Sequence, residues 1–329
     1  MTTNDNLRIS LESAARGADW LLQLLQPDGS FRGGSDLRAY YKTPAALLAS
    51  GHSIDAHRVM DHIEARYLRS AGDLDGQGVP WIDLYRTYPH SWIAVAAMMS
   101  GRFELARELT GYIATHHNAA SGGFYADAAQ TIEEVMTTSM AGLACLWTGR
   151  HDLGLAAASW LERLYTSQPD LRSGLYTSWR DGLVLDMQDP GAFVDSAKTR
   201  QYYFQYGISA ALLTSAAGMT GDLKWLELAK SFLRASEFAG PDRYQTPQSG
   251  KIGWGAAWTY RMTKAPEELA LVGAVARGLA ALQNDDGSWL VTGVYGGASA
   301  EADSATIDIT SEFVALQSFL AQVGNAKSI

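Results

Sequence analysis

The sequence predicts an all-α protein built as two concentric rings of six helices, an (α/α)6 toroid. Apolar residues recur with helical spacing along nearly the whole chain, and the helical segments come in six pairs that fill the 329 residues. In each pair the first helix is the more charged, whereas the second is richer in Ala, Gly and aromatic residues. Because a helix that is apolar all round must be buried on all sides, we expect the second helices to form the inner ring.

The outer helices are predicted, in chain order, at residues 7–26, 57–70, 103–117, 153–167, 225–238 and 266–283. The inner helices are predicted at residues 36–50, 81–100, 133–148, 198–218, 252–263 and 309–323. Gly51, Gly101 and Gly149 follow the first three inner helices, and glycine commonly ends a helix. Links from an outer to an inner helix are long and the return links are short, so we expect the long links to share one rim. We interpret residues 1–329 as a single domain.

A short turn recurs in four of the long links, as DGSF, GGFY, SGLY and DGSW. In each copy a glycine is expected to reverse the chain, and the aromatic residue at the end of the turn is expected to fold back between helix ends. Packing is therefore the first role that we assign to this motif.

The two ends of the chain carry the strongest family signal. QNDDGSW, at residues 283–289, has the form Gln, three residues, Gly, any residue, Trp, and resembles the QW repeat of squalene-hopene and oxidosqualene cyclases. QPDGSF, at residues 26–31, resembles a copy that is one residue shorter. On these residues the chain resembles the terpenoid cyclase and protein prenyltransferase α/α-toroid superfamily. A second group with the same double ring includes linalool dehydratase-isomerase, N-acylglucosamine 2-epimerase and unsaturated glucuronyl hydrolase, so the fold alone does not fix the function.

The sequence also departs from the pattern of these families. It lacks the Asp-X-Asp-Asp acid motif of triterpene cyclases and the DDXXD magnesium motif. Its single cysteine, Cys145, does not supply the zinc ligands of lanthionine cyclases, and it lies apart from any grouping like that of the prenyltransferases. We therefore expect no metal and no cofactor.

Composition and charge indicate the class of binding partner and the cellular compartment. Hydrophobic residues make up 47% of the chain and charged residues 19%, which is typical of a globular protein. A net charge of −9 without a basic run argues against nucleic acid, so a small-molecule substrate is the expected partner. The N-terminal residues have no signal-peptide core and no integral membrane segment is predicted, so we expect a cytoplasmic protein. The oligomeric state stays open.

Candidate catalytic residues lie near the predicted starts of the inner helices. Asp83 and His90 are seven residues apart in one predicted helix, so both could face one pocket as general acid and base. Glu312 stands in the apolar run ITSEFVALQSFL, where a charge needs a partner or a chemical role. Tyr203 is a candidate proton donor. Each residue also has a structural reading: Asp83 as a helix-start carboxylate, His90 as a hydrogen-bonded core histidine and Glu312 as half of a buried ion pair.

Candidate substrate-binding residues share the same rim. Lys198, Arg200 and Gln201 could together hold an anionic or carbonyl group. Trp254 and Trp258, four residues apart on one helix, could wall an isoprenoid cavity, stabilise a cation or stack a sugar, and could equally be plain core. The remaining candidates are polar or aromatic residues expected in the first turns of inner helices: Asp36, Tyr41, Trp81 and Tyr88.

Three functions follow from these residues. We favour a cofactor-independent cyclase, isomerase or lyase that uses acid and base chemistry on an isoprenoid or another apolar natural product in an aromatic-lined central cavity. The second is a sugar-active toroid enzyme, an epimerase, lyase or hydrolase acting on a uronic or amino sugar. The third is a non-catalytic binding protein. A closed aromatic pocket would favour the first, and an open polar cleft the second.

Overall fold

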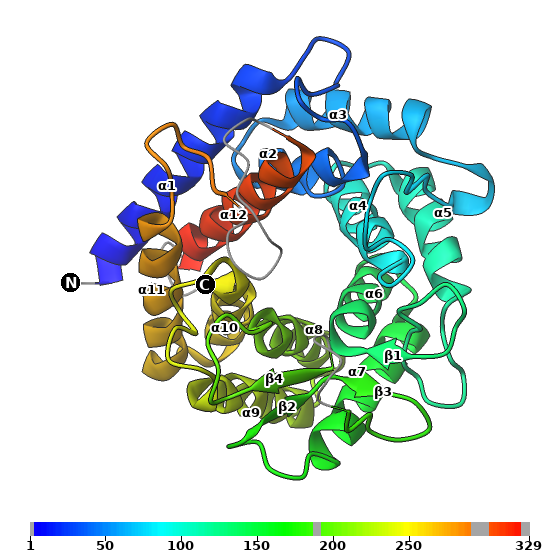
Figure 1. The fold of residues 1–329 in the computed structure, drawn as a ribbon, viewed down its shortest axis with the longest axis vertical. Coiled ribbons are helices and arrows are strands. Elements are labelled where there is room, and N and C mark those ends of the chain that lie inside the picture. Colours follow the sequence, from blue (N-terminus) through cyan, green and yellow to red (C-terminus); the bar gives the residue numbers. More distant parts are fainter. Residues whose placement is uncertain (1–2, 187–191, 291–302, 324–329) are drawn as a thin grey trace.

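The fold is a closed double ring of helices, as the sequence predicts. The computed structural model describes residues 3–186, 192–290 and 303–323. The outer helices of these ranges are α1 (Thr3–Leu24), α3 (Ser53–Arg66), α5 (Phe103–Ala114), α7 (His151–Thr166), α9 (Leu223–Ala235) and α11 (Pro266–Ala281). The inner helices are α2 (Thr43–Ala49), α4 (Thr87–Met99), α6 (Val135–Trp147), α8 (Phe204–Thr220), α10 (Gly250–Thr263) and α12 (Ser304–Gln322). Figure 1 shows the even-numbered helices around the centre and the odd-numbered helices outside them.

Contacts between neighbours close the inner ring. Helix α12 packs on α2 and on α10, and the series continues through α4, α6 and α8. Helices α8 and α10 approach each other closely, since a Cβ atom on Gly207 would lie 1.8 Å from the carbonyl oxygen of Lys251. Glycine at this crossing therefore draws the two helices together. Among the described helices, none combines the length and the apolar composition needed to cross a bilayer.

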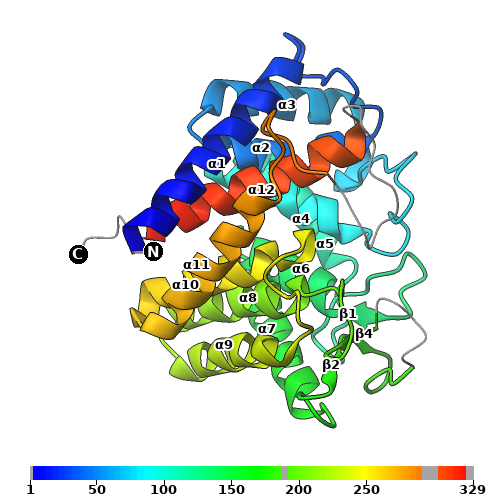
Figure 2. The same ribbon diagram turned by 60° about the vertical axis from the view of Figure 1, so that its left-hand side comes forward.

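Short elements fill the long links. Four 3₁₀ turns lie at η1 (Leu37–Ala39), η2 (Ser70–Gly72), η3 (Ser236–Phe238) and η4 (Pro247–Ser249). Strand β1 (Glu133–Glu134) pairs antiparallel with β3 (Ser178–Trp179), and β2 (Gly174–Tyr176) pairs antiparallel with β4 (Phe193–Asp195). Figure 2 shows the strands on one side of the molecule, with the long links of the middle hairpins. The predicted links at 172–195 and 284–306 lie partly outside the described residues.

Three inner helices begin later than predicted. Helices α2, α4 and α8 start six or seven residues further along the chain, so that Asp36, Asp83 and Lys198 precede their helices. Pro44 and Pro89 explain the first two starts, because each lies in the first turn of its helix, where the missing N–H is tolerated. A helix begun earlier would place these prolines in its interior. Ahead of α8, Arg200 has a left-handed backbone (φ 56°), which no α-helix contains.

The repeated turns pack as predicted, except that one predicted copy is replaced by a turn in another hairpin. Gly29, Gly72, Gly122 and Gly287 all have positive φ, and each lies against a backbone carbonyl of an outer helix, in α3, α5, α7 and α1 respectively. The residue that follows within each turn is buried: Phe31, Leu74, Phe124 and Trp289. The predicted SGLY copy is wrong, because Gly174 lies in β2 instead. The second hairpin supplies the fourth copy, with a leucine in place of the aromatic residue.

Candidate active site

Four charged side chains of the inner ring form a buried chain of ion pairs. The ammonium of Lys42, at the start of α2, lies 2.9 Å from Asp308 Oδ1 and 2.5 Å from Glu312 Oε2, both on α12. The other carboxylate oxygen of Glu312 accepts a hydrogen bond from Lys251 of α10. Lys42, Glu312 and Lys251 are nearly inaccessible, whereas the Asp308 side chain keeps 16% of its exposure. We call these four residues the ion chain.

Burial and charge set the protonation of the ion chain. Burial raises the pKa of Asp308, and the nearby Lys42 and Tyr41 oppose this rise only in part. Burial would also raise the pKa of Glu312, but Lys251 and Lys42 overcome it and lower that pKa to about 2. Burial lowers the pKa of Lys251, whereas the pKa of Lys42 is raised by Asp308 and Glu312 against the effect of burial. Glu312 is therefore held ionised, and Asp308 is the carboxyl that most readily carries a proton.

Aromatic rings surround the ion chain. Lys42 lies 5.0 Å from the ring centre of Tyr41, and Lys251 lies 5.3 Å from that of Phe204. Tyr88 of α4 is within 5.9 Å of both ammonium groups. Trp81 packs edge-on against Tyr41 and Tyr88, at ring distances of 6.0 and 6.4 Å. A cation over an aromatic face is stabilised by the ring quadrupole, so these rings help to hold two lysines out of water.

The ring centre is filled below the ion chain. Trp92 of α4 and Trp254 of α10 stack with ring centres 6.1 Å apart and an interplanar angle of 19°. These helices lie on opposite sides of the inner ring, so the pair spans its middle. Trp92 and Trp254 lie about one helical turn beyond Tyr88 and Lys251. Asp308 lies one turn before Glu312, toward the rim where the inner helices begin. Asp308 therefore lies on the rim side of the stacked Trp92 and Trp254 rings.

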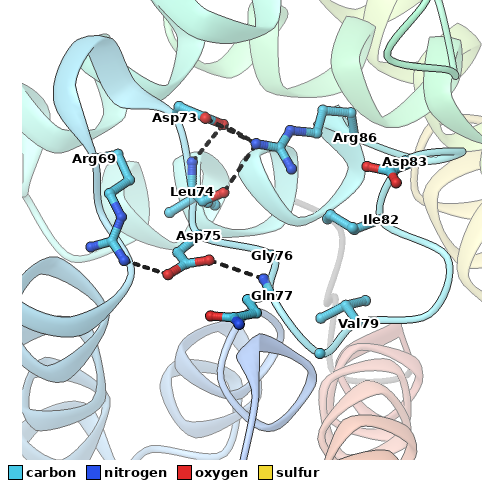
Figure 3. A pocket seen from close by; sticks show the side chains of 11 residues that line it. Arg69, Asp73, Leu74, Asp75, Gly76, Gln77, Val79, Ile82, Asp83 and Arg86 are labelled. Atoms are coloured by element: carbon cyan, nitrogen blue, oxygen red, sulfur yellow. Dashed lines mark hydrogen bonds and ion pairs between the residues drawn. The ribbon is translucent and has the colours of Figure 1, made fainter.

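A separate polar pocket of about 510 Å³ opens in the link between α3 and α4 (Figure 3). Its charged groups are Arg69, Asp73, Asp75, Asp83 and Arg86. Arg86 donates to both oxygens of Asp73, at 2.8 and 2.9 Å, and Arg69 donates to Asp75. The lack of aromatic lining distinguishes this pocket from the ion chain.

The structure does not bring the predicted catalytic residues together. Glu312 belongs to the ion chain, whereas Asp83 lines the polar pocket. His90 is fully buried on the outer side of α4, where it stacks on Tyr112 of α5 at 4.4 Å and lies 3.6 Å from Asp73. Burial lowers the pKa of His90, and its Nδ1 bonds the carbonyl of Arg86, 2.9 Å away. Tyr203 is also buried, and its hydroxyl donates to Asp242.

The predicted binding residues divide into two groups. Tyr41, Trp81 and Tyr88 lie beside the ion chain, and Trp254 forms its floor. Trp258 lies further from the rim and packs on Phe319. Asp36 caps η1 and pairs with Arg38, while Lys198, Arg200 and Gln201 bond residues of their own or a neighbouring link.

Of the four residues of the ion chain, only Glu312 is among the candidate catalytic and substrate-binding residues predicted from the sequence. Lys251 follows a glycine in the stretch GKIGWG, and Lys42 precedes Thr43 and Pro44. The signal that selects Glu312, a charge on an otherwise apolar inner helix, applies equally to Lys251 and would have found it. Asp308 satisfies the same criterion one turn earlier on α12.

Comparison with known proteins establishes the fold. No protein-family model matches the chain, and no curated protein matches it. Among solved structures, an inactive variant of the α-1,6-mannanase of Salegentibacter sp. in complex with α-1,6-mannotetrose has a TM-score of 0.67 and 12% identity, covering 95% of this chain and 99% of the other. A family 76 glycoside hydrolase from a bovine Bacteroides thetaiotaomicron strain has a TM-score of 0.66 and 12% identity, covering 95% and 77%.

A terpene cyclase shares the same architecture. A variant of the type II terpene cyclase MstE from Scytonema, bound to geranylgeranyl dihydroxybenzoate, has a TM-score of 0.60 and 14% identity, covering 97% of this chain and 99% of the other. At these identities the likeness shows a shared fold alone. The α/α toroid is thus common to this chain, to glycoside hydrolases and to a terpene cyclase, and the resemblance to the cyclase superfamily is supported at the level of the fold.

Proposed function

We propose that the chain is a cofactor-independent cyclase, isomerase or lyase in which Asp308 protonates an apolar, isoprenoid-like substrate. The observation that carries this proposal is the ion chain. It holds one carboxyl whose pKa is raised by burial, Asp308, beside Lys42 and among Tyr41, Trp81 and Tyr88. A carboxyl with a raised pKa in an aromatic site is suited to act as a general acid.

The chemistry follows from these neighbours. The O–H bond of Asp308 breaks, its proton forms a new bond to an alkene carbon or an oxygen of the substrate, and a carboxylate remains. Lys42 stabilises that carboxylate without moving, since its ammonium already contacts Asp308 at 2.9 Å. The rings of Tyr41, Trp81 and Tyr88 fold the chain of the substrate and stabilise positive charge that develops away from the lysines. A base must finally remove a proton from the resulting cationic intermediate, which gives the neutral product.

The alternative reading, hydrolysis of a sugar, receives less support from the ion chain. Glycosidases commonly use two carboxyl groups, one as acid and one as base or nucleophile. Both oxygens of Glu312 are occupied by lysines, so Glu312 is poorly placed for the second role. The inactive mannanase variant lacks two neighbouring aspartates. The neighbouring aspartates of this sequence are Asp285 and Asp286, and Asp286 bonds Ser288 within the turn before Trp289.

The test is product formation in D₂O. The purified protein is incubated with linear isoprenoids that end in an alkene or an epoxide, with geranylgeranyl dihydroxybenzoate, and with α-1,6-mannotetrose. We expect an isoprenoid product that carries one deuterium from solvent at the protonated carbon when an alkene reacts. Asp308→Asn should reduce this turnover by at least ~100-fold. Reducing ends released from the mannotetrose, without any isoprenoid product, would establish the sugar-active reading instead.

A matched variant distinguishes Asp308 from Asp83 as the catalytic acid. Asp83→Asn makes the same chemical change in the polar pocket, and we expect it to leave turnover near that of the unmodified protein. Loss of turnover in Asp83→Asn but not in Asp308→Asn would move the chemistry to the pocket of Figure 3.

The pH dependence should report on Asp308. Because burial raises its pKa, the protonated donor is present at low pH and disappears as the pH rises through that raised value. Turnover should therefore fall on the alkaline side. Glu312, with a pKa of about 2, stays ionised across this range and adds no acidic limb. A profile that rises with pH would contradict the assignment of Asp308 as the acid.

A further inference from the structure

Exposed apolar side chains gather at the end of the ring where inner helices finish and outer helices start. Seven of the large apolar residues exposed in the described chain lie there: Ile54, Met99, Phe103, Trp147, Met219, Leu223 and Met262. Met99, Trp147, Met219 and Met262 lie in the last turn of an inner helix, whereas Ile54, Phe103 and Leu223 lie in the first turn of an outer helix. We call these seven residues the apolar end. It is opposite the rim where the inner helices begin.

Aromatic contacts link Trp147 of the apolar end to partly buried rings on two other inner helices. Trp147 of α6 stands edge-on to Trp258 of α10, with ring centres 6.3 Å apart, although these helices are not neighbours in the inner ring. Trp258 in turn packs on Phe319 of α12 at 5.1 Å. Figure 2 shows the links that follow α8 and α10 on the side away from the β-strands. Exposed apolar side chains that gather on one part of a protein surface mark an interaction site.

Charge distinguishes this end from the rest of the molecule. The five short links and the first turns after them, residues 50–58, 99–107, 147–155, 219–227 and 261–268, carry seven Lys or Arg and seven Asp or Glu. The whole chain has a net charge of −9, so the excess negative charge lies elsewhere. Several of these charges are paired locally, as in Arg102 with Asp61 and Arg150 with Asp152.

We propose that the apolar end binds a second copy of this chain, end to end. Two copies of an acidic protein repel each other across most of their surface, and a symmetric contact brings identical patches together. A patch without net charge avoids that repulsion, and its exposed Trp, Phe, Leu and Met side chains supply apolar area. An anionic membrane would require an excess of basic residues, which this end does not have. The substrate rims then face outward at both ends of the dimer.

The test introduces a charge where the structure tolerates it. Leu223, 65% exposed, is the first residue of α9, and a carboxylate is favourable in the first turn of a helix. Leu223→Glu should therefore fold normally but place two like charges in a symmetric contact. Leu11→Glu is the matched control, because Leu11 is 61% exposed on the outer helix α1. Sedimentation velocity across a concentration series measures the dissociation constant of each protein.

We expect a dimer for the unmodified protein and for Leu11→Glu, and a dissociation constant at least ~10-fold higher for Leu223→Glu. A monomer at every concentration would overturn the proposal, as would a dimer equally sensitive to both substitutions or insensitive to Leu223→Glu. Sedimentation with neutral phosphatidylcholine vesicles, lost in Leu223→Glu while the free protein stays monomeric, would assign the apolar end to a membrane instead. None of these outcomes depends on catalytic activity.

Discussion

The turn before Trp289 and the ion chain are both polar features of the helix ring, but only the turn is repeated. Gly287 and Gly29 reverse the chain in the same way and lie against outer-helix carbonyls. The backbone N–H of Trp289 donates to the hydroxyl of Thr310 at 3.0 Å, and Phe124 makes the same bond to Thr138. The ion chain has no counterpart in the other hairpins of the described chain. A feature that is repeated in several hairpins is explained by the packing of the ring. A buried group of charges that occurs once is not explained by that packing and indicates a function.

Among the variants that test this comparison, Glu312→Gln is expected to cause the largest loss of stability. This change leaves the buried ammonium of Lys251 without its carboxylate, and removing one partner of a buried ion pair commonly costs about 3–5 kcal/mol. We expect a loss of that size in the free energy of unfolding, measured by urea denaturation. Glu104→Gln is the control, because Glu104 pairs with Arg107 on the open surface and should leave stability unchanged.

The same residue predicts a pH effect of defined sign. The pKa of Glu312 falls from its ordinary value of 4.5 to about 2 in the folded protein. Its stabilising contribution is therefore present above pH 4.5 and is lost as the pH falls from 4.5 toward 2. The unmodified protein should lose stability over this interval more steeply than Glu312→Gln. Parallel curves would show that the lysines do not hold Glu312 ionised.

The repeated part of the molecule was predictable from the sequence, because its signals are local. Helical periodicity, the glycines after inner helices and the DGSF and DGSW turns predict the double ring correctly. Even here, the structure aligns the two end turns differently from the sequence motif. Gln26 makes the backbone bonds that Asn284 makes, whereas Gln283 ties its turn to α1 through the carbonyl of Ser13. The missing residue of the shorter copy is thus the glutamine itself.

The candidate site was less predictable, because it depends on which face of a helix each side chain occupies. His90 and Tyr88 are two residues apart on α4, yet His90 packs outward on α5 and Tyr88 packs inward on Lys42 and Lys251. Asp83 was expected in the same helix, but Pro89 sets a later start and leaves Asp83 in a link. Residues distant in sequence, such as Lys42 and Glu312, meet only because the ring closes.

Trp289→Ala tests the structural side of the comparison. Trp289 is 1% exposed, packs on Phe313 at 5.6 Å and donates its indole N–H to the carbonyl of Leu279. Removing a buried aromatic side chain of this size should cost about 3 kcal/mol. Turnover per folded molecule should not change. Activity lost at an unchanged melting temperature would show that this turn contributes to the chemistry.

Gly287→Ala should have a smaller effect with two separable causes. Gly287 has φ 96°, and a Cβ atom there would lie 2.4 Å from the carbonyl oxygen of Arg16. We expect a loss of about 2 kcal/mol. Gly51 is the control, since it has φ 90° but nothing within 4 Å of its Cβ position, so Gly51→Ala reports the backbone strain alone. Equal losses in the two variants would mean that the contact with α1 does not matter.

The smallest expected effect tests whether equivalent hydrogen bonds in two hairpins contribute equally to stability. Thr310→Val and Thr138→Val keep the shape of the side chain but remove the oxygen that accepts from a buried backbone N–H, of Trp289 in one case and Phe124 in the other. An unsatisfied buried donor should cost about 1–2 kcal/mol in each. Thr115→Val, at an exposed threonine, controls for the substitution itself. Because both hydroxyls occupy the same place in their hairpins, the two losses should agree within about 0.5 kcal/mol. A much larger loss at Thr310 would show that the sixth hairpin, which closes the ring onto α1, contributes more to the free energy of unfolding than the equivalent hairpins do.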